Sequence, residues 1–210
     1  MPETDLCKLT QLNPLVSSAS LAGVRADAAQ PHVLVALSAQ GHRFICTNGY
    51  HQFENEIRSG ISEHSGKDFT MSIAATPGPH GLPAAVGTQT AFPPVISRIG
   101  AESQLSLLLE ISPELGWFHG HFPGQPILAG VVQLHWAVTV ARTHFNLDHG
   151  PLDVSRLKFK NVVLPPTILE LALHRVAANQ VHFTFSSFSN QHSEGRLKFP
   201  GGTASSRAHQ

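Results

Sequence analysis

The chain has 210 residues, carries 14 lysines and arginines against 14 aspartates and glutamates, and is only 13% charged. This balance gives no support to a nucleic-acid partner, and the length suffices for one or two domains with a substantial core. Two cysteines, Cys7 and Cys46, lie far apart, which favours neither a disulfide framework nor a metal site and indicates a reducing, cytoplasmic setting. The start, MPETDLCK, lacks the basic and apolar regions of a signal peptide.

Residues 1–91 carry the weakest signals. We interpret them as an N-terminal extension of uncertain structure, either a small appendage or a poorly ordered segment rather than an active domain. Thr76–Pro94, which overlaps the end of this extension, is rich in proline, glycine, alanine and threonine, which indicates a linker or an irregular covering segment. Three short strands are expected, with a Gln40–Gly41 turn between the first two: Pro31–Ser38, His42–Thr47 and Phe69–Ala75.

The stretch Trp117–Phe145 has two halves of opposite character. Up to Pro126 it consists largely of glycine, proline, histidine and aromatic residues, which predicts an irregular turn. The part that follows is a nearly unbroken apolar run, which predicts a buried helix. Residues 127–141 are too few to span a bilayer and include Gln133 and His135, so we expect a core helix and no membrane span.

Strand-like segments lie on both sides of this helix. One of them, Val181–Phe185, alternates with the period of a half-buried antiparallel strand. A helix that is apolar all round must be covered on most sides, and a curved antiparallel sheet wrapped around it achieves this. The sequence therefore predicts an α+β fold with one long central helix. The expected strands are Gln104–Ile111, Val154–Val163, Thr167–Val176, Val181–Ser189 and Gly195–Phe199, with a break at Asn190–Glu194.

The segment GHFPGQPILAG, from Gly120 to Gly130, resembles the signature of the hotdog-fold 3-hydroxyacyl-[acyl-carrier-protein] dehydratases of the FabA/FabZ type. The continuation VVQLHWA, the strand VSRLKFKNVVLPP and the ending EGRLKF are more similar still to the ApeI-like dehydratases found in aryl-polyene clusters. The resemblance covers about residues 92–199 and implies one hotdog domain there. Residues 200–210 then form a tail that we expect to be disordered.

The resemblance implies dehydration of a 3-hydroxyacyl thioester to the trans-2-enoyl thioester, in fatty-acid or aryl-polyene-type biosynthesis, without a metal or an organic cofactor. His121 occupies the position of the histidine that takes the α-proton. Gly130 matches the glycine whose backbone N–H, at the start of the helix, binds the thioester oxygen. The family's acid, which protonates the leaving hydroxyl, is an aspartate or glutamate, and His135 stands in its place here.

The resemblance also implies a homodimer with active sites between its subunits, and an acyl carrier protein whose phosphopantetheine presents the substrate. Arg156, Lys158 and Lys160 alternate on an expected strand, where they form either a solvated face or a landing patch for an acidic carrier. Ala129 replaces a proline that is usual in the family. The further candidate substrate-binding residues are Phe122, Pro123, Gly124 and Trp136.

Three other readings stay open. In a hotdog thioesterase the helix commonly carries an aspartate, glutamate or asparagine, whereas this helix offers only Gln133 and His135. A non-catalytic hotdog protein would bind acyl carriers or accompany a catalytic subunit, and His135 in the acid's place is its main argument. A metal site built from His119, His121 and His135 lacks a cysteine or carboxylate to complete it. Both His121 and His135 also have structural alternatives, in a tight turn and in a helix interface.

Overall fold

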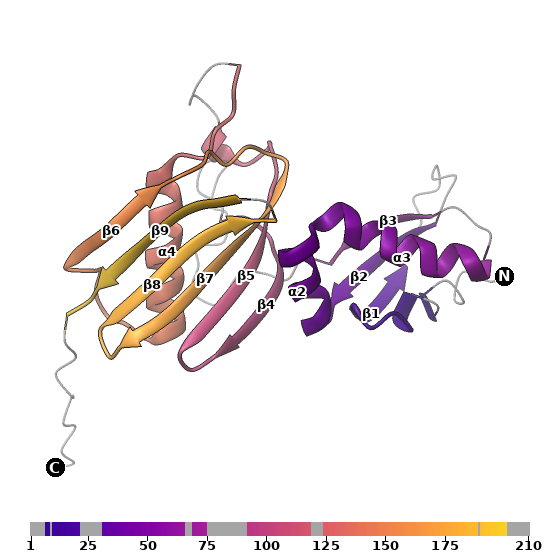
Figure 1. The fold of residues 1–210 in the computed structure, drawn as a ribbon, viewed down its shortest axis with the longest axis horizontal. Coiled ribbons are helices and arrows are strands. Elements are labelled where there is room, and N and C mark those ends of the chain that lie inside the picture. The colour runs from indigo at the N-terminus through magenta and orange to yellow at the C-terminus, as the bar shows by residue number, and fades with distance from the viewer. Residues whose placement is uncertain are drawn as a thin grey trace, which may run out of the picture.

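The computed structural model describes residues 7–8, 10–21, 31–65, 69–74, 92–118, 124–188 and 190–200. Most of the expected linker Thr76–Pro94 and all but the first residue of the expected tail 200–210 lie outside these residues. Figure 1 shows a small part near the N-terminus beside a larger part made from the later half of the chain. No helix of the described residues combines the length and the apolar character needed to cross a membrane.

Residues 7–74 form a folded unit with its own core, which we call the N-terminal layer. Its three strands lie in the order β1-β2-β3, with β1 antiparallel and β3 parallel to β2. Val33 and Val35 of the sheet pack with Phe53 and Ile57 of a helix, and none of the four is more than 1% exposed. The elements are β1 (Val16–Leu21), β2 (His32–Leu37), α2 (Ala39–Asn48), α3 (Tyr50–Ser65) and β3 (Thr70–Ile73). Of the two alternatives expected from the sequence, the layer corresponds to the small appendage and has its own secondary structure.

The strand predicted over His42–Thr47 is wrong, because these residues belong to α2. The Gln40–Gly41 turn is wrong for the same reason, since both residues lie in the first turn of this helix. Ser38 explains the difference: its Oγ accepts a hydrogen bond from the Gly41 N–H at 3.0 Å and so caps the helix start. The cap defines the helix start, and burial of Ile45 in the core of the layer supports the helix against the strand preference of this segment.

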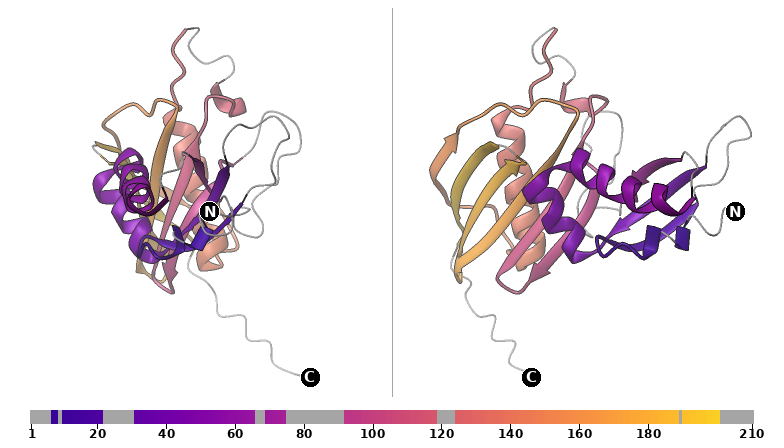
Figure 2. Two further views of the ribbon diagram at one scale, coloured as in Figure 1. Left: turned by 90° about the vertical axis from the view of Figure 1, so that its right-hand side faces the viewer. Right: turned by 45° about the vertical axis from the view of Figure 1, so that its right-hand side comes forward.

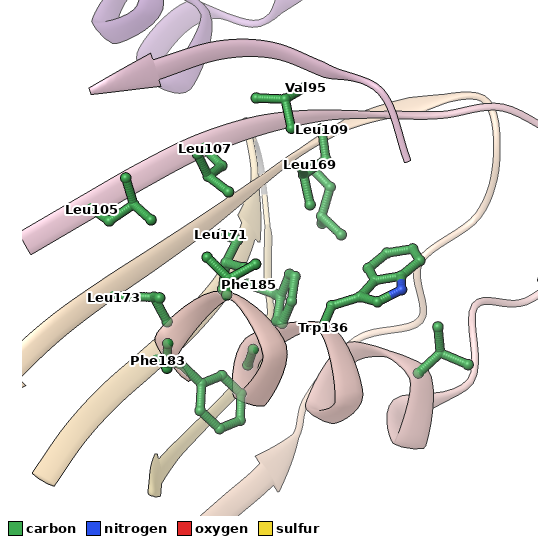
Figure 3. Close-up of a cluster of buried hydrophobic side chains, with 14 of the residues drawn as sticks. Val95, Leu105, Leu107, Leu109, Trp136, Leu169, Leu171, Leu173, Phe183 and Phe185 are labelled. Carbon is green, nitrogen blue, oxygen red and sulfur yellow. The ribbon is translucent and has the colours of Figure 1, made fainter. Parts of the chain in front are cut away.

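The larger part is a six-stranded antiparallel sheet with one helix on its inner face (Figures 1 and 3), which confirms the predicted α+β arrangement. The strand order is β4-β5-β7-β8-β9-β6, so β4 and β6 are the edges. The elements are β4 (Val95–Ala101), β5 (Gln104–Ile111), η1 (Gly116–Phe118), α4 (Gly130–Phe145), β6 (Asp153–Phe159), β7 (Thr167–Ala177), β8 (Gln180–Ser187) and β9 (Asn190–Lys198).

The core of this part lies between α4 and the inner face of the sheet. Strand residues alternate, so that Leu169 and Leu171 point toward the helix and Ile168 and Glu170 point away from it. Figure 3 shows Trp136 of α4 projecting toward the leucines of β5 and β7. Apolar side chains of both elements are almost fully buried there: Leu105, Leu107, Leu109, Trp136, Ala137, Val140, Ala141, Leu169, Leu171, Phe183 and Phe185.

The break predicted at Asn190–Glu194 is wrong, because these residues form the first half of β9. Their polar side chains suggested a loop. In the structure β9 lies between β8 and β6, so that its backbone groups find hydrogen-bond partners on both sides. Buried side chains in this segment are polar too: His192 is 5% exposed, and its Nε2 lies 2.8 Å from Ser187 Oγ.

The N-terminal layer packs on the outer face of the larger sheet. Ile96 and Leu108 point away from α4 and join the core of the layer, with Ile168 packed against it. His42 of α2 reaches the same face, where its two ring nitrogens lie 2.7 Å from Ser97 Oγ and 2.8 Å from Ser106 Oγ. Figure 2 shows the layer beside β4 and β5 in its right-hand view. Burial lowers the pKa of His42.

Gly195 on β9 tests how tightly the inner face is packed. A Cβ at this position would lie 2.6 Å from Phe183 Cε1 and 3.3 Å from Leu157 Cδ1. We therefore expect Gly195→Ala to lower the free energy of unfolding by about 1–3 kcal/mol through overpacking. Gly60→Ala is the matched control, since a Cβ there meets nothing within 4 Å and α3 gains about 0.5–1 kcal/mol from alanine. Urea denaturation measures both, and an unchanged Gly195→Ala protein would contradict the packing.

Candidate functional site

Three of the predicted site residues, His121, Phe122 and Pro123, lie outside the described residues, as does His119. The site is therefore described from the segments on either side of them. η1 precedes the gap and Gly124 follows it. Gly124 is exposed and has a φ of 87°, a conformation that favours glycine.

Gly130 is the first residue of α4, as the sequence predicted. The first N–H groups of a helix have no acceptor within the helix, and the dipole makes this end positive. Ala129 precedes the helix and supplies no side-chain cap. The N–H groups of the first turn are thus suited to bind an oxygen that carries negative charge.

Gly130 also lies under the ring of Phe159, the last residue of β6. A Cβ on Gly130 would approach Phe159 Cε1 to 2.5 Å and Cζ to 2.6 Å. Even the smallest side chain would displace this ring. Because Phe159 is 53% exposed, its ring has room to move, so packing within the chain favours the glycine and does not require it.

The side chain of Gln133 fixes the turn that leads into α4. Gln133 is 2% exposed, and its Nε2 donates to the Leu128 carbonyl at 3.3 Å. Its Oε1 accepts from Ser193 Oγ of β9 at 2.7 Å. The Leu128 N–H donates in turn to the Val163 carbonyl at 3.0 Å. The turn before Gly130 is thus held to the helix and to the sheet, a role that the sequence did not indicate.

His135 and Trp136 are neighbours on α4, and their side chains point about 100° apart around the helix axis. His135 is exposed, and its ring centroid lies 6.4 Å from that of Trp117. Trp136 is 1% exposed and packs edge-on against Phe92, with the ring centroids 5.6 Å apart. His135 therefore lies on the accessible side of the helix. Trp136 is a core residue, and its position gives no support to the predicted substrate contact.

Arg156 lies in a bulge of β6, with a φ of 53°. The bulge interrupts the alternation on which the expected basic face rests, and β6 ends at Phe159 rather than Val163. Lys158 and Lys160 both face Glu194, at 4.0 and 3.1 Å. The hydrogen bond from Lys160 lowers the pKa of Glu194. The charges of Lys158 and Lys160 are therefore partly balanced by Glu194. Arg156, the third residue of the expected basic face, is exposed.

Apolar side chains next to the helix start are exposed, which the sequence analysis missed. Val131 is 70% and Phe159 53% exposed, although both adjoin Gly130. Val162 is 58% and Leu164 43% exposed in the segment after β6. The apolar character of α4 on all sides was the available signal, because the sheet covers only one side of a helix.

A cavity of about 1030 Å³ lies between the N-terminal layer and the outer face of the larger sheet. It is lined by Tyr50 and Ile96, and by Glu110 and Ser112 at the end of β5. Gly130 and His135 do not line it. The candidate chemistry at the helix start is therefore separate from this cavity.

Comparison with known proteins identifies the family of the larger part. Residues 97–196 match the family model described as ApeI-like: ApeI dehydratase. No curated protein matches the chain. Among solved structures, the dehydratase heterocomplex ApeI:P from Xenorhabdus doucetiae is 28% identical, with 51% of this chain and 97% of that chain covered and a TM-score of 0.48.

An uncharacterized protein from Erwinia carotovora subsp. atroseptica is 32% identical, with 51% of this chain and 95% of that chain covered and a TM-score of 0.45. The dehydratase domain from the CurF module of curacin polyketide synthase is 20% identical over 54% of this chain and 45% of that chain, with a TM-score of 0.43. On this match to the family model, the part of the chain that spans residues 97–196 belongs to the ApeI-like dehydratases, a family of hotdog-fold dehydratases.

Proposed function

We propose that the protein dehydrates a 3-hydroxyacyl thioester, carried by an acyl carrier protein, to the trans-2-enoyl thioester. The observation that carries this proposal is the start of α4: Gly130 opens the helix directly after the motif turn, and His135 lies exposed about one and a half turns further on. The positive end of α4 and an exposed imidazole therefore lie about 7.5 Å apart along the helix axis. Membership of a dehydratase family supports the reaction class.

In the proposed mechanism the substrate's thioester oxygen binds the N–H groups at the start of α4. Neutral His121 takes the α-proton, and the enolate-like oxygen is stabilised by these N–H groups. Protonated His135 donates its proton to the departing hydroxyl, which leaves as water as the C–O bond breaks. His121 is then an imidazolium and His135 a neutral imidazole, so solvent must carry a proton from His121 to His135 before the next turnover. Only one of the two imidazoles has to be protonated to the imidazolium at any time.

We further propose that the site forms between two copies of the chain. Val131 and Phe159 expose apolar surface beside Gly130, and β6 is an edge strand of the sheet. Exposed apolar patches and unpaired sheet edges are typical of interfaces. A second copy packed here would cover these side chains and the open side of α4. The exposed Arg156 suits an acidic carrier protein that approaches the same edge.

A second candidate function is that of a non-catalytic partner. His135 stands where the family has an aspartate or glutamate, and the ApeI relative from Xenorhabdus doucetiae is described as part of a dehydratase heterocomplex. In this alternative the chain binds the acyl carrier, and a different hotdog subunit supplies the acid. The test below separates the two candidates, because only an enzyme turns over by itself.

His121→Ala is expected to lower the dehydration rate by about 10²–10⁴-fold, the usual contribution of a general base. His135→Ala should cause a loss of similar size, and His135→Asp should restore much of it. The assay follows enoyl absorbance and product mass with a 3-hydroxyacyl-carrier protein. His174→Ala is the control, since His174 is exposed on β7 and points away from α4. Free thiol instead of enoyl product would indicate a thioesterase, and carrier binding without turnover would favour the non-catalytic partner.

Mixing the two inactive variants tests the shared site. If the base comes from one subunit and the acid from the other, a heterodimer of His121→Ala and His135→Ala chains has one complete site and one that lacks both groups. Random exchange should then restore about a quarter of the wild-type rate, because about half of the dimers are mixed. No recovery after verified subunit exchange would place both histidines of a site on one chain.

Gln133→Leu is expected to lower kcat about ten- to hundredfold with little change in KM, because the turn before Gly130 loses its fixed position. Ser193→Ala should have a smaller effect, since the bond from Gln133 to the Leu128 carbonyl remains. The urea midpoint of each variant is measured alongside the kinetics. A fall in stability with unchanged kcat would show that Gln133 supports the fold but not the reaction.

A further inference from the structure

A second cluster of reactive side chains lies far from α4, where the N-terminal layer meets the outer face of the larger sheet. His42 and Cys46 come from α2, and Glu170 comes from β7. They offer an imidazole nitrogen, a sulfur and a carboxylate oxygen, and these donor atoms all lie within 4.8 Å of one another. His42 is 2% exposed, and the other two residues are half-buried.

The secondary structure explains why these three side chains converge. Residues four apart on a helix project from the same face, about one turn from each other, and His42 and Cys46 have this spacing. Glu170 points to the outer face because its neighbours Leu169 and Leu171 point into the core. The cluster therefore joins two separately built layers through side chains fixed on regular elements.

The charge of Glu170 is not balanced by any described cation. The ion pairs among the described residues join Arg58 to Glu54, and Lys158 and Lys160 to Glu194. Glu170 instead accepts hydrogen bonds from the hydroxyls of Ser106 and Ser186, at 2.7 and 3.2 Å, and from the thiol of Cys46. Carboxylates that are removed from solvent are usually paired with a cation or bound to a metal.

The surroundings of the cluster suit a bound ion. His42 Nδ1 lies 2.7 Å from Ser97 Oγ, so that a second residue orients the ring, and Nε2 lies next to Ser106 Oγ, which donates a hydrogen bond to Glu170. Ser106 and Glu170 line a cavity of about 470 Å³ at the outer face, which provides an entry path. Ser106 Oγ lies 2.8 Å from His42 Nε2. When an ion binds, Nε2 would contact the ion instead of Ser106, and Ser106 would keep its hydrogen bond to Glu170.

We propose that His42, Cys46 and Glu170 bind a divalent transition-metal ion of the zinc class, which ties the N-terminal layer to the hotdog sheet. Imidazole and thiolate ligands select this class over magnesium or calcium. The ligand atoms of a tetrahedral zinc ion stand about 3.5 Å apart, so binding requires each side chain to move inward by roughly an ångström. A fourth position remains for water or a serine hydroxyl. The ion is structural, since α4 lies on the other face of the sheet.

The test uses the full chain, stripped with a chelator and titrated with Co²⁺ in the absence of oxygen. Co²⁺ is a spectroscopic substitute for zinc, and a thiolate ligand gives it a charge-transfer absorption band. We expect one Co²⁺ per chain, the thiolate band, and loss of the band when Zn²⁺ is added in excess. Absence of the band would overturn the proposal and leave a hydrogen-bonded cluster of side chains.

The chain has two cysteines, which provides a matched pair of variants. Cys46→Ser should abolish the thiolate band, whereas Cys7→Ser should keep it, and the reverse result would overturn the proposal. Glu170→Gln should raise the Co²⁺ dissociation constant at least about tenfold, and an unchanged constant would contradict the assigned ligand set. Zn²⁺ should raise the thermal midpoint of the wild type and of Cys7→Ser, but not that of Cys46→Ser. His135→Ala should bind Co²⁺ as the wild type does.

Discussion

The packing of one side of α4 against the inner face of the six-stranded sheet is the contact on which the rest of the structure depends. Trp136 and Ala137 are almost fully buried in it. Successive helix residues are about 100° apart, so the buried position of Trp136 determines where its neighbours point. His135 faces out, and Val131 lies one turn earlier on the same side. Which side chains of α4 remain accessible to a ligand is thus a consequence of how the helix packs.

The sequence predicted this arrangement well because its signals were strong and local. β5 has the expected bounds, and β7 differs from its expected bounds by one residue at its end. Proline and glycine mark most ends of these strands, and the inner-face residues alternate with period two. The start of α4 at Gly130 followed from the motif. What the sequence could not show is that a single sheet leaves Val131 and Phe159 exposed, since the amount of cover depends on tertiary structure.

The wrong prediction over His42–Thr47 shows how local signals can compete. For His42–Thr47, a β-type composition competed with the serine cap at Ser38 and with burial of Ile45 on one face of a helix, and the segment is helical. The consequence reaches beyond secondary structure. On a strand, His42 and Cys46 would stand about 13 Å apart, whereas on a helix they are about 6 Å apart. The strand assignment therefore concealed that His42 and Cys46 can bind the same ion. The spacing of Cys7 and Cys46 in the sequence gave no information on this point.

The two faces of the sheet separate two kinds of chemistry. Leu169 and Leu171 stabilise the core beneath α4, while Glu170 between them reaches the N-terminal layer. Alternation places neighbouring strand residues on opposite faces of the sheet. Polar residues where the N-terminal layer meets the sheet can therefore be substituted without altering the packing under α4. The reverse also holds: Gln133 and Ser193 act on the turn before Gly130 from the inner side. The proposed reaction and the proposed metal site therefore depend on the same strands but on different side chains, and each can be removed by substitution while the other is retained.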